Sequence, residues 1–161
     1  MVESLLLLFP KTIMSPLNKK TIHEKLFRLR EHTKVLEELL LEGRDVFFAD
    51  HKTQDSATLN MFTGIEMIID IGNHIITEMF QKQAKTYAEV ITLLGETGVI
   101  PKTFAKENET MPKFRNLVAH DYDKITPEGV YENLQKAPDI FRQFAKHFVE
   151  FLDRGQNQNA S

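Results

Sequence analysis

The chain has 161 residues, enough for one domain with a sizeable hydrophobic core. Hydrophobic residues make up 42% and charged residues 27%, a composition typical of a globular protein and not of a disordered one. The formal net charge of -3 argues against general nucleic-acid binding, so any contact with RNA or DNA requires a local basic patch. The absence of cysteine excludes disulfides, thiolate zinc sites and cysteine nucleophiles, and it fits a reducing cytoplasm.

The two ends of the chain differ from its middle. The first segment, "MVESLLLLFPKTIM", holds an apolar run from Leu5 to Phe9, but it lacks a basic leader and is too short to span a bilayer. The last segment, "GQNQNAS", is polar and is predicted to be disordered. Met14 is an alternative start. We therefore expect a cytoplasmic protein without a membrane anchor, made of an N-terminal extension (1–17), a helical bundle (18–154) and a tail (155–161).

Apolar residues recur at helical spacing through most of the chain. The first helical segment ends at Gly43 and repeats at intervals of four and three: Ile22, Leu26, Leu29, Thr33, Leu36 and Leu40. A second segment runs from about Asp55 to Gln81. The third, "TYAEVITLLGETG", stops at its glycines, and the fourth runs from roughly Lys102 to Tyr122.

The fifth segment has a clear start signal, with Thr126 as N-cap and Pro127 at the first helical position. Pro138 lies within it and is expected to kink or split the helix. No segment alternates with the period of two that a strand requires. The sequence therefore predicts an all-α protein, an up-and-down bundle of about five helices.

The second segment is apolar on nearly all sides, except for a narrow polar stripe. Glu66, Asp70, His74 and Glu78 are each four residues apart and therefore stack on one side of a helix. The stripe either faces water or pairs with itself along the helix, or it forms the wall of an active site or of a dimer interface. A metal site is not expected, because Asp70 and His74 alone are too few ligands and no Glu-x-x-His occurs.

The segment "FRNLVAHDY", residues 114–122, gathers polar groups of distinct chemistry. On a helix, the apolar residues Phe114, Leu117 and Val118 share one arc, while Arg115, Asn116 and His120 lie on the opposite side. Asn116 and His120 are four apart and can touch. Tyr122 joins this face only if the helix ends near His120, which the aspartates that follow and the Thr126 start favour.

Such a face suits metal-free cleavage of RNA, in which the ribose 2′-hydroxyl attacks the neighbouring phosphate. Histidine, with an unperturbed pKa near 6.5, can take and return a proton at neutral pH, so His120 is a candidate general base or acid. Arg115 is a permanent planar cation that matches phosphate oxygens and stabilises the charge that builds on them. The alternative is an ordinary amphipathic helix whose polar side happens to hold an arginine and a histidine.

The motif Arg115-x4-His120-x-Tyr122 resembles the Arg-x4–6-His motif of HEPN domains, in the form found in HepT-like toxins. Three segments, the last of which contains the motif, resemble the family in the same order: "IEMIIDIGNHIITEM", "TYAEVITLLGETGVIP" and "FRNLVAHDYDKITPEGVYENL". The likeness covers roughly residues 20–150. The N-terminal extension and Pro138 depart from the pattern, and neither touches the motif.

The resemblance implies a helical homodimer in which two copies of the motif line one cleft. It implies a metal-independent ribonuclease toxin without cofactors, with Arg115 and His120 as catalytic residues. The partner is typically a minimal nucleotidyltransferase of the MntA type, which neutralises the toxin by transferring AMP to a tyrosine, here Tyr122. Asn116 matches a polar residue that commonly follows the arginine, and the "D-x-x-N-H" of the second helix supplies supporting residues: Asp70, Asn73 and His74.

Given the negative net charge, we expect the RNA surface to include Lys113 and Lys124 beside Arg115, doubled by the dimer. Two other functions stay open from the sequence. The chain could be a non-catalytic helical subunit that binds the nucleotidyltransferase or a nucleotide. It could also be a structural bundle in which Arg115 and His120 pair only with neighbouring carboxylates.

Overall fold

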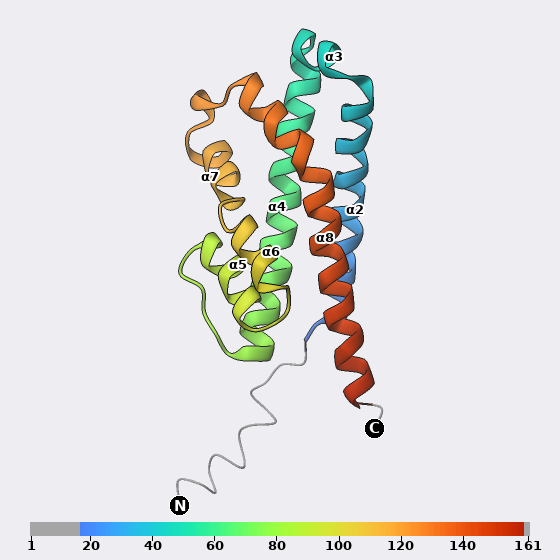
Figure 1. Cartoon of the computed structure of the whole chain (residues 1–161), viewed down its shortest axis with the longest axis vertical. Coiled ribbons are helices and arrows are strands. Elements are labelled where there is room, and N and C mark those ends of the chain that lie inside the picture. Colours follow the sequence, from blue (N-terminus) through green and yellow to red (C-terminus); the bar gives the residue numbers. More distant parts are fainter. Residues whose placement is uncertain (1–16, 160–161) are drawn as a thin grey trace, which may run out of the picture.

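The computed structural model describes residues 17–159, and every regular element in this range is helical. Figure 1 shows three long helices side by side: α2 (Lys19–Glu42), α4 (His51–Phe80) and α8 (Pro127–Asn159). Short α3 (Arg44–Ala49) joins the first two. Along the other side of α4 lie the shorter elements: α5 (Tyr87–Glu96), α6 (Lys102–Asn108), α7 (Pro112–His120) and the 3-10 turn η1 (Tyr122–Lys124). The predicted all-α fold is confirmed.

Side-chain caps define where the long helices begin. The side chain of Asn18 accepts a hydrogen bond from the backbone N–H of Thr21, which satisfies a free donor in the first turn of α2. Asp50 does the same for Lys52 at the start of α4, and its side chain also accepts from the hydroxyl of Thr53. The start of α4 is therefore four residues earlier than the predicted Asp55, since its polar first turn carries no apolar period.

Aromatic side chains of α8 fill the centre of the bundle. Phe141, Phe144 and Phe148 are almost completely buried against the isoleucines of α4. Gly64 on α4 makes this approach possible, because a Cβ atom at this position would collide with the ring of Phe141. Each fully buried side chain of this size contributes about 1.5–3 kcal/mol of hydrophobic stabilisation. This packing fixes the position of α4, and α7 packs against α4 in turn.

Two prolines, Pro112 and Pro138, affect the helices in different ways. The single fourth helix was wrong: α6 ends at Asn108, and α7 begins at Pro112 after a short turn. Proline lacks the N–H of a continuing helix and favours the first position of a new one, which explains the break. Pro138, by contrast, does not split α8, which continues through it. Figure 1 shows α8 changing direction within its first half.

The structure describes the two ends of the chain only in part. Residues 1–16 of the predicted extension, including Met14, and the last two residues of the predicted tail lie outside the described range. Helix α8 reaches Asn159, within the segment predicted as tail. Among residues 17–159, no helix combines the length and apolar character needed to cross a membrane.

Candidate active site

Helix α7 carries the polar motif and ends where the motif requires. Pro112 occupies its first turn, and the backbone N–H of Asp121 bonds to the carbonyl of Leu117, which closes the last turn at His120. The chain then turns into η1, which begins at Tyr122. The predicted end of the helix near His120 is confirmed. Tyr122 is thereby released from the helical path that would have turned it away from His120.

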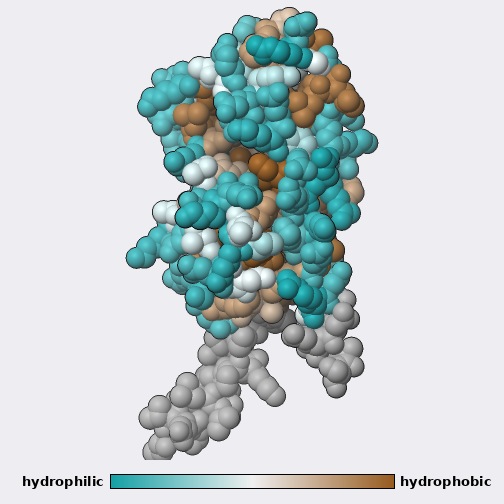
Figure 2. All heavy atoms as spheres, in the orientation of Figure 1, coloured by the Kyte–Doolittle hydropathy of each residue, from teal (hydrophilic) through white to brown (hydrophobic). Residues whose placement is uncertain are grey.

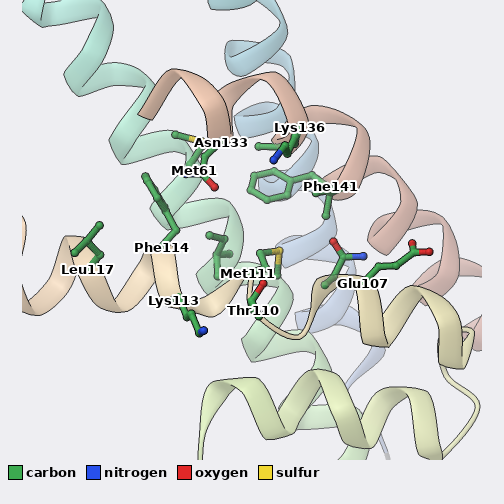
Figure 3. Close-up of a pocket in the computed structure, with 14 residues that line it drawn as sticks. Met61, Glu107, Thr110, Met111, Lys113, Phe114, Leu117, Asn133, Lys136 and Phe141 are labelled. Carbon is green, nitrogen blue, oxygen red and sulfur yellow. The ribbon is translucent and has the colours of Figure 1, made fainter. Parts of the chain in front are cut away.

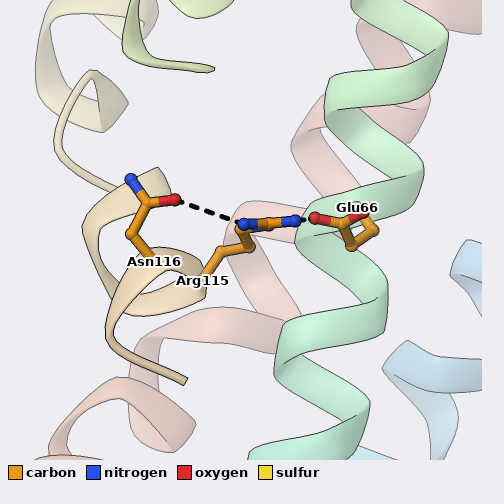
Figure 4. Close-up of polar contacts among 3 residues, drawn as sticks. All are labelled: Glu66, Arg115 and Asn116. Atoms are coloured by element: carbon orange, nitrogen blue, oxygen red, sulfur yellow. Dashed lines mark hydrogen bonds and ion pairs between the residues drawn. The ribbon is translucent and has the colours of Figure 1, made fainter. Parts of the chain in front are cut away.

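Arg115 is held in a defined position between α7 and α4. Its Nε donates to Oε1 of Glu66, forming an ion pair, and its Nη1 lies 3.5 Å from Oδ1 of Asn116 (Figure 4). The guanidinium also lies 4.6 Å from the ring centre of Tyr87 and 5.4 Å from that of Phe62. Only 15% of the Arg115 side chain is exposed, so its position is set by the neighbouring side chains.

Glu66 and Asn116 engage only part of the donors of the guanidinium. Glu66 engages Nε, and a guanidinium has five N–H donors in a fixed fork. The terminal nitrogens therefore remain the donors that a phosphate oxygen would meet, with Asn116 beside one of them. The two aromatic rings restrict rotation of the fork and add a cation–π attraction of about 0.5–1 kcal/mol each at such partly exposed positions.

His120 has a different environment from Arg115. It lies exposed at the last position of α7, and within residues 17–159 its ring forms no hydrogen bond or ion pair. Five residues separate it from Arg115, which corresponds to about 7.5 Å along the helix axis and roughly 140° around it. Neighbouring side chains thus hold Arg115 in place, whereas His120 on the same helix is open to solvent.

Tyr122 also lies at the surface, next to the end of α7. Its side chain is 58% exposed, and its hydroxyl lies 3.4 Å from Oδ1 of Asp55 on α4, to which it donates. Lys124 pairs with Asp121 at 3.2 Å. Lys113 is exposed and lies at the opposite edge of α7, beside the groove between α7 and α8. The two lysines predicted to bind RNA therefore flank α7 from different sides.

The polar stripe of α4 finds its partners on neighbouring helices, and no pair forms along the stripe within the described structure. Asp70 forms an ion pair with Lys25 of α2, with 3.0 Å between Oδ2 and Nζ. Nε2 of His74 accepts a hydrogen bond of 3.2 Å from the backbone N–H of Asn18. Glu66 pairs with Arg115 on the other side. The described residues of the stripe thus do not pair along the helix: Asp70 is exposed to water, and Glu66 contacts Arg115 of the motif.

The supporting residues therefore divide between two places. Asp70, Asn73 and His74 line a small surface pocket of about 370 Å³ between α2 and α4, together with Lys25 and Glu78. Neither Arg115 nor His120 belongs to this pocket. Within one chain, the "D-x-x-N-H" segment and the motif of α7 therefore do not share a pocket, although Glu66, one turn before Asp70, contacts Arg115. Along the described part of the chain, no three Asp, Glu or His side chains gather closely enough to form a metal site.

A groove between α7 and α8 lies behind the motif. It has a volume of about 620 Å³, an apolar floor that includes Met61, Phe114 and Phe141, and polar groups at its rim such as Lys113 and Lys136 (Figure 3). Figure 2 shows apolar side chains gathered in the hollow between these helices and at the end of the molecule near α3. The groove is lined by the apolar side of α7, and none of Arg115, Asn116 and His120 contributes to it.

Sequence reasoning missed the residues that surround the two key side chains. Glu66 was recognised as part of the stripe but not as the partner of Arg115, and Phe62, Tyr87 and Asp55 carried no signal of their own. All four depend on how α5 and α7 dock against α4, which local patterns do not specify. The one available hint was that Glu66 interrupts an otherwise apolar helix and therefore needs a partner.

The helical fold and the surface motif of α7 together define the class of helical ribonucleases that the sequence resembles. A family model described as Ribonuclease HepT-like matches residues 29–148. The chain belongs to this family, as the resemblance predicted, and is a ribonuclease by class.

Relatives and solved structures agree with this assignment. The chain is 27% identical to an mRNA nuclease HepT of Shewanella oneidensis, over 76% of this chain and 92% of the relative. It is 26% identical to a tRNA nuclease HepT of Aphanizomenon flos-aquae, over 92% of this chain and 99% of the relative. The fold is similar to that of a tri-AMPylated HEPN toxin of Shewanella oneidensis in complex with an MNT antitoxin, with 26% identity, a TM-score of 0.72 and coverage of 80% and 96%.

Proposed function

We propose that this chain is an endoribonuclease toxin that cleaves RNA without a metal ion, as a homodimer in which two copies of α7 line one cleft. The observation that carries the proposal is the fixed guanidinium of Arg115 five residues before an exposed His120. A fixed cation and a free proton carrier are the two groups that intramolecular attack by a 2′-hydroxyl needs. The names of the two relatives, an mRNA nuclease and a tRNA nuclease, support RNA as the substrate.

The reaction assigns one role to each group. Neutral His120 takes the proton of the 2′-hydroxyl, whose oxygen then bonds to the adjacent phosphorus. The terminal nitrogens of Arg115 stabilise the negative charge on the pentacoordinate phosphorus centre. The bond from phosphorus to the 5′-oxygen breaks, a 2′,3′-cyclic phosphate forms, and the leaving oxygen receives a proton from the imidazolium or from water. General base catalysis of this kind contributes about 10²–10⁴-fold.

The different directions of Arg115 and His120 within one chain support a dimer. Arg115 is turned toward α4, whereas His120 faces outward at the end of α7. The 2′-hydroxyl and the 3′-phosphate that these groups must reach are neighbouring groups on one ribose. A second copy of α7 across a two-fold axis would bring further arginine and histidine groups to the same phosphate and exclude water from it.

Control by a nucleotidyltransferase is the second part of the proposal. The similar HEPN toxin is AMPylated and bound to an MNT antitoxin. The chain has three tyrosines, and Tyr122 is the most exposed of them, at 58%. Tyr87 lies against Arg115, and Tyr131 packs against Phe47. AMP on Tyr122 would place a bulky anion beside the end of α7 and so block approach of RNA to His120.

The test is cleavage of total cellular RNA by purified protein in excess EDTA. Wild type and His120→Ala are compared, and intact mass spectrometry checks each preparation for AMP. Cleavage by wild type alone supports the proposal and places His120 in the chemistry. Failure of an unmodified wild-type dimer to cleave would contradict it and favour a non-catalytic subunit that binds the nucleotidyltransferase. Cleavage that EDTA abolishes would contradict the metal-free mechanism.

A further inference from the structure

Helix α2 carries a concentration of positive charge that the active site does not use. Residues 19–34 hold six lysines and arginines against two glutamates, a formal net charge of +4. The other residues of the chain hold 14 basic and 21 acidic side chains, a net charge of -7. The charge of the protein is therefore divided between one basic helix segment and an acidic remainder.

Part of this charge forms a stripe on the outer face of α2. The stripe residues recur at intervals of three and four and are all exposed: Lys20, His23, Phe27, Arg30 and Lys34. They point away from the buried face of the same helix, which contains Ile22, Leu26 and Leu29. The α2 stripe extends over 15 residues, from Lys20 to Lys34, or about 21 Å of helix.

The cations of the α2 stripe have no partner in the described structure. Within residues 17–159, none of Lys20, His23, Arg30 and Lys34 takes part in an ion pair. By contrast, Lys25 on the flank of the same helix pairs with Asp70. Glu24 and Glu31 lie beside the stripe without bonding to it. The positive charge of the α2 stripe is thus available to an external anion.

An aromatic side chain stands at the centre of these cations. Phe27 is 65% exposed, and it lies in a shallow hollow with Lys20, His23 and Arg28, where Glu24 is the one acidic residue of the lining. An exposed phenylalanine between cations is the arrangement that single-stranded nucleic acids favour, since bases stack on the ring while phosphates meet the cations. A partner protein of acidic character would use the cations but would not require the flat face of the ring.

We infer that the α2 stripe is an RNA-docking surface, separate from the cleavage motif, that binds several nucleotides of a single strand through their phosphates and one stacked base. The inference rests on the proposed ribonuclease function, and it names where the substrate is held. Figure 1 shows α2 and α7 on opposite sides of α4. Two interhelical spacings of about 8–10 Å separate them, so only an extended strand reaches both the stripe and Arg115.

The experiment measures binding and cleavage separately. Binding of a labelled single-stranded RNA of about 16 nucleotides is followed between about 50 and 200 mM salt, in a His120→Ala background that prevents cleavage. The variant Lys20→Gln/Arg30→Gln/Lys34→Gln removes three cations from the stripe. The control Lys82→Gln/Lys102→Gln/Lys106→Gln removes three exposed, unpaired cations from other parts of the described chain.

Three lost phosphate contacts should reduce the slope of log affinity against log salt by about 2, since each contributes about 0.7 with single strands. The control variant should keep the slope of the parent. Phe27→Leu should weaken binding by about fivefold or more, whereas Phe27→Tyr should retain it, because only the tyrosine offers a ring for stacking. Equal slopes for the two triple variants, or tight binding by Phe27→Leu, would overturn the inference.

Cleavage in the active background distinguishes this inference from the proposed function. The ratio of kcat/KM for the long RNA over that for a dinucleotide should fall in the α2 variant and not in the control. If wild type cleaves RNA and this ratio is unchanged, the docking surface is wrong and the ribonuclease function stands. If wild type cleaves nothing, the ribonuclease function fails. If the α2 variant binds RNA normally but loses the nucleotidyltransferase, the α2 stripe is a protein interface, which also overturns the inference.

Discussion

Glu66 of α4 and Arg115 of α7 form an ion pair that joins the scaffold to the motif. The carboxylate holds Nε, so the orientation of the guanidinium is set by a helix whose other face is packed in the core. An arginine placed in this way does not have to be ordered when the phosphate arrives, which reduces the entropic cost of binding. The precision of the site therefore depends on the docking of α7 against α4.

Removing Glu66 should reduce RNA cleavage although it touches no substrate. We expect Glu66→Ala to lower kcat by about tenfold, which corresponds to loss of one hydrogen bond to a charged group. Glu66→Gln should lose less, because its amide oxygen still accepts from Nε. Glu78→Ala is the matched control, since Glu78 belongs to the same stripe and its carboxylate bonds to no described residue. Equal rates for Glu66→Ala and Glu78→Ala would disprove the positioning role.

Replacing Arg115 by lysine should abolish most activity despite conserving the charge. Lysine has no Nε–H for Glu66 and no planar fork for the phosphate, so both contacts lose their geometry. We expect cleavage to fall by about 10²–10³-fold, as for loss of one donor to a developing anion. Steady-state cleavage of a defined RNA measures the effect, and a thermal melt checks that the fold persists. Near-normal cleavage by Arg115→Lys would show that only net charge matters.

Under the proposed function, Tyr122 should be the acceptor of AMP when the chain is incubated with an MNT-type nucleotidyltransferase and ATP. Intact and peptide mass spectrometry should find the modification in wild type and in Tyr87→Phe, but not in Tyr122→Phe. Asp55→Asn should slow the modification, because Asp55 accepts from the tyrosine hydroxyl and directs it. Modification that persists in Tyr122→Phe would assign the acceptor to another residue.

The close approach of α4 and α8 gives a prediction on stability. A methyl group at Gly64 would meet the ring of buried Phe141, so Gly64→Ala should destabilise the fold by about 1–3 kcal/mol. Gly155→Ala is the control: it lies exposed near the end of α8 with open space around its Cβ position, and there alanine should be neutral or slightly stabilising. Urea unfolding midpoints compare the two. A stable Gly64→Ala variant would show that Phe141 moves freely.

The partly buried His147 should make stability depend on pH. Burial lowers the pKa of His147 below its usual value of 6.5, although Glu150 opposes this shift. Between the lowered pKa and 6.5 the unfolded chain binds more protons than the folded one, so the free energy of unfolding falls as pH decreases through this window. His147→Gln should remove this part of the pH dependence. If the free energy of unfolding falls equally with decreasing pH below 6.5 in wild type and in His147→Gln, His147 is not the source of the pH dependence.

The helices with a continuous apolar period were predictable, whereas the pairings between them were not. The repeat of Ile22, Leu26 and Leu29 specifies the buried face of α2 without any knowledge of its neighbours. Glu66 and Arg115 are 49 residues apart in sequence, and their pairing depends on how α7 docks against α4. No local pattern encodes this docking. The same holds for Asp70 and His74, whose bonds go to α2 and not to the motif. The break at Pro112 was foreseeable, since proline marks a helix start.

The double use of α4 limits how this protein can change over time. Twelve of its thirty residues are buried in the bundle, and several of the others hold Arg115, Lys25, Tyr122 or the start of α2. Substitutions at these positions, about half of α4, would therefore harm either folding or the contacts that α4 makes at the surface. In a library of random variants, tolerated changes should be rarest in α4 and more frequent on the outer faces of α6 and α8.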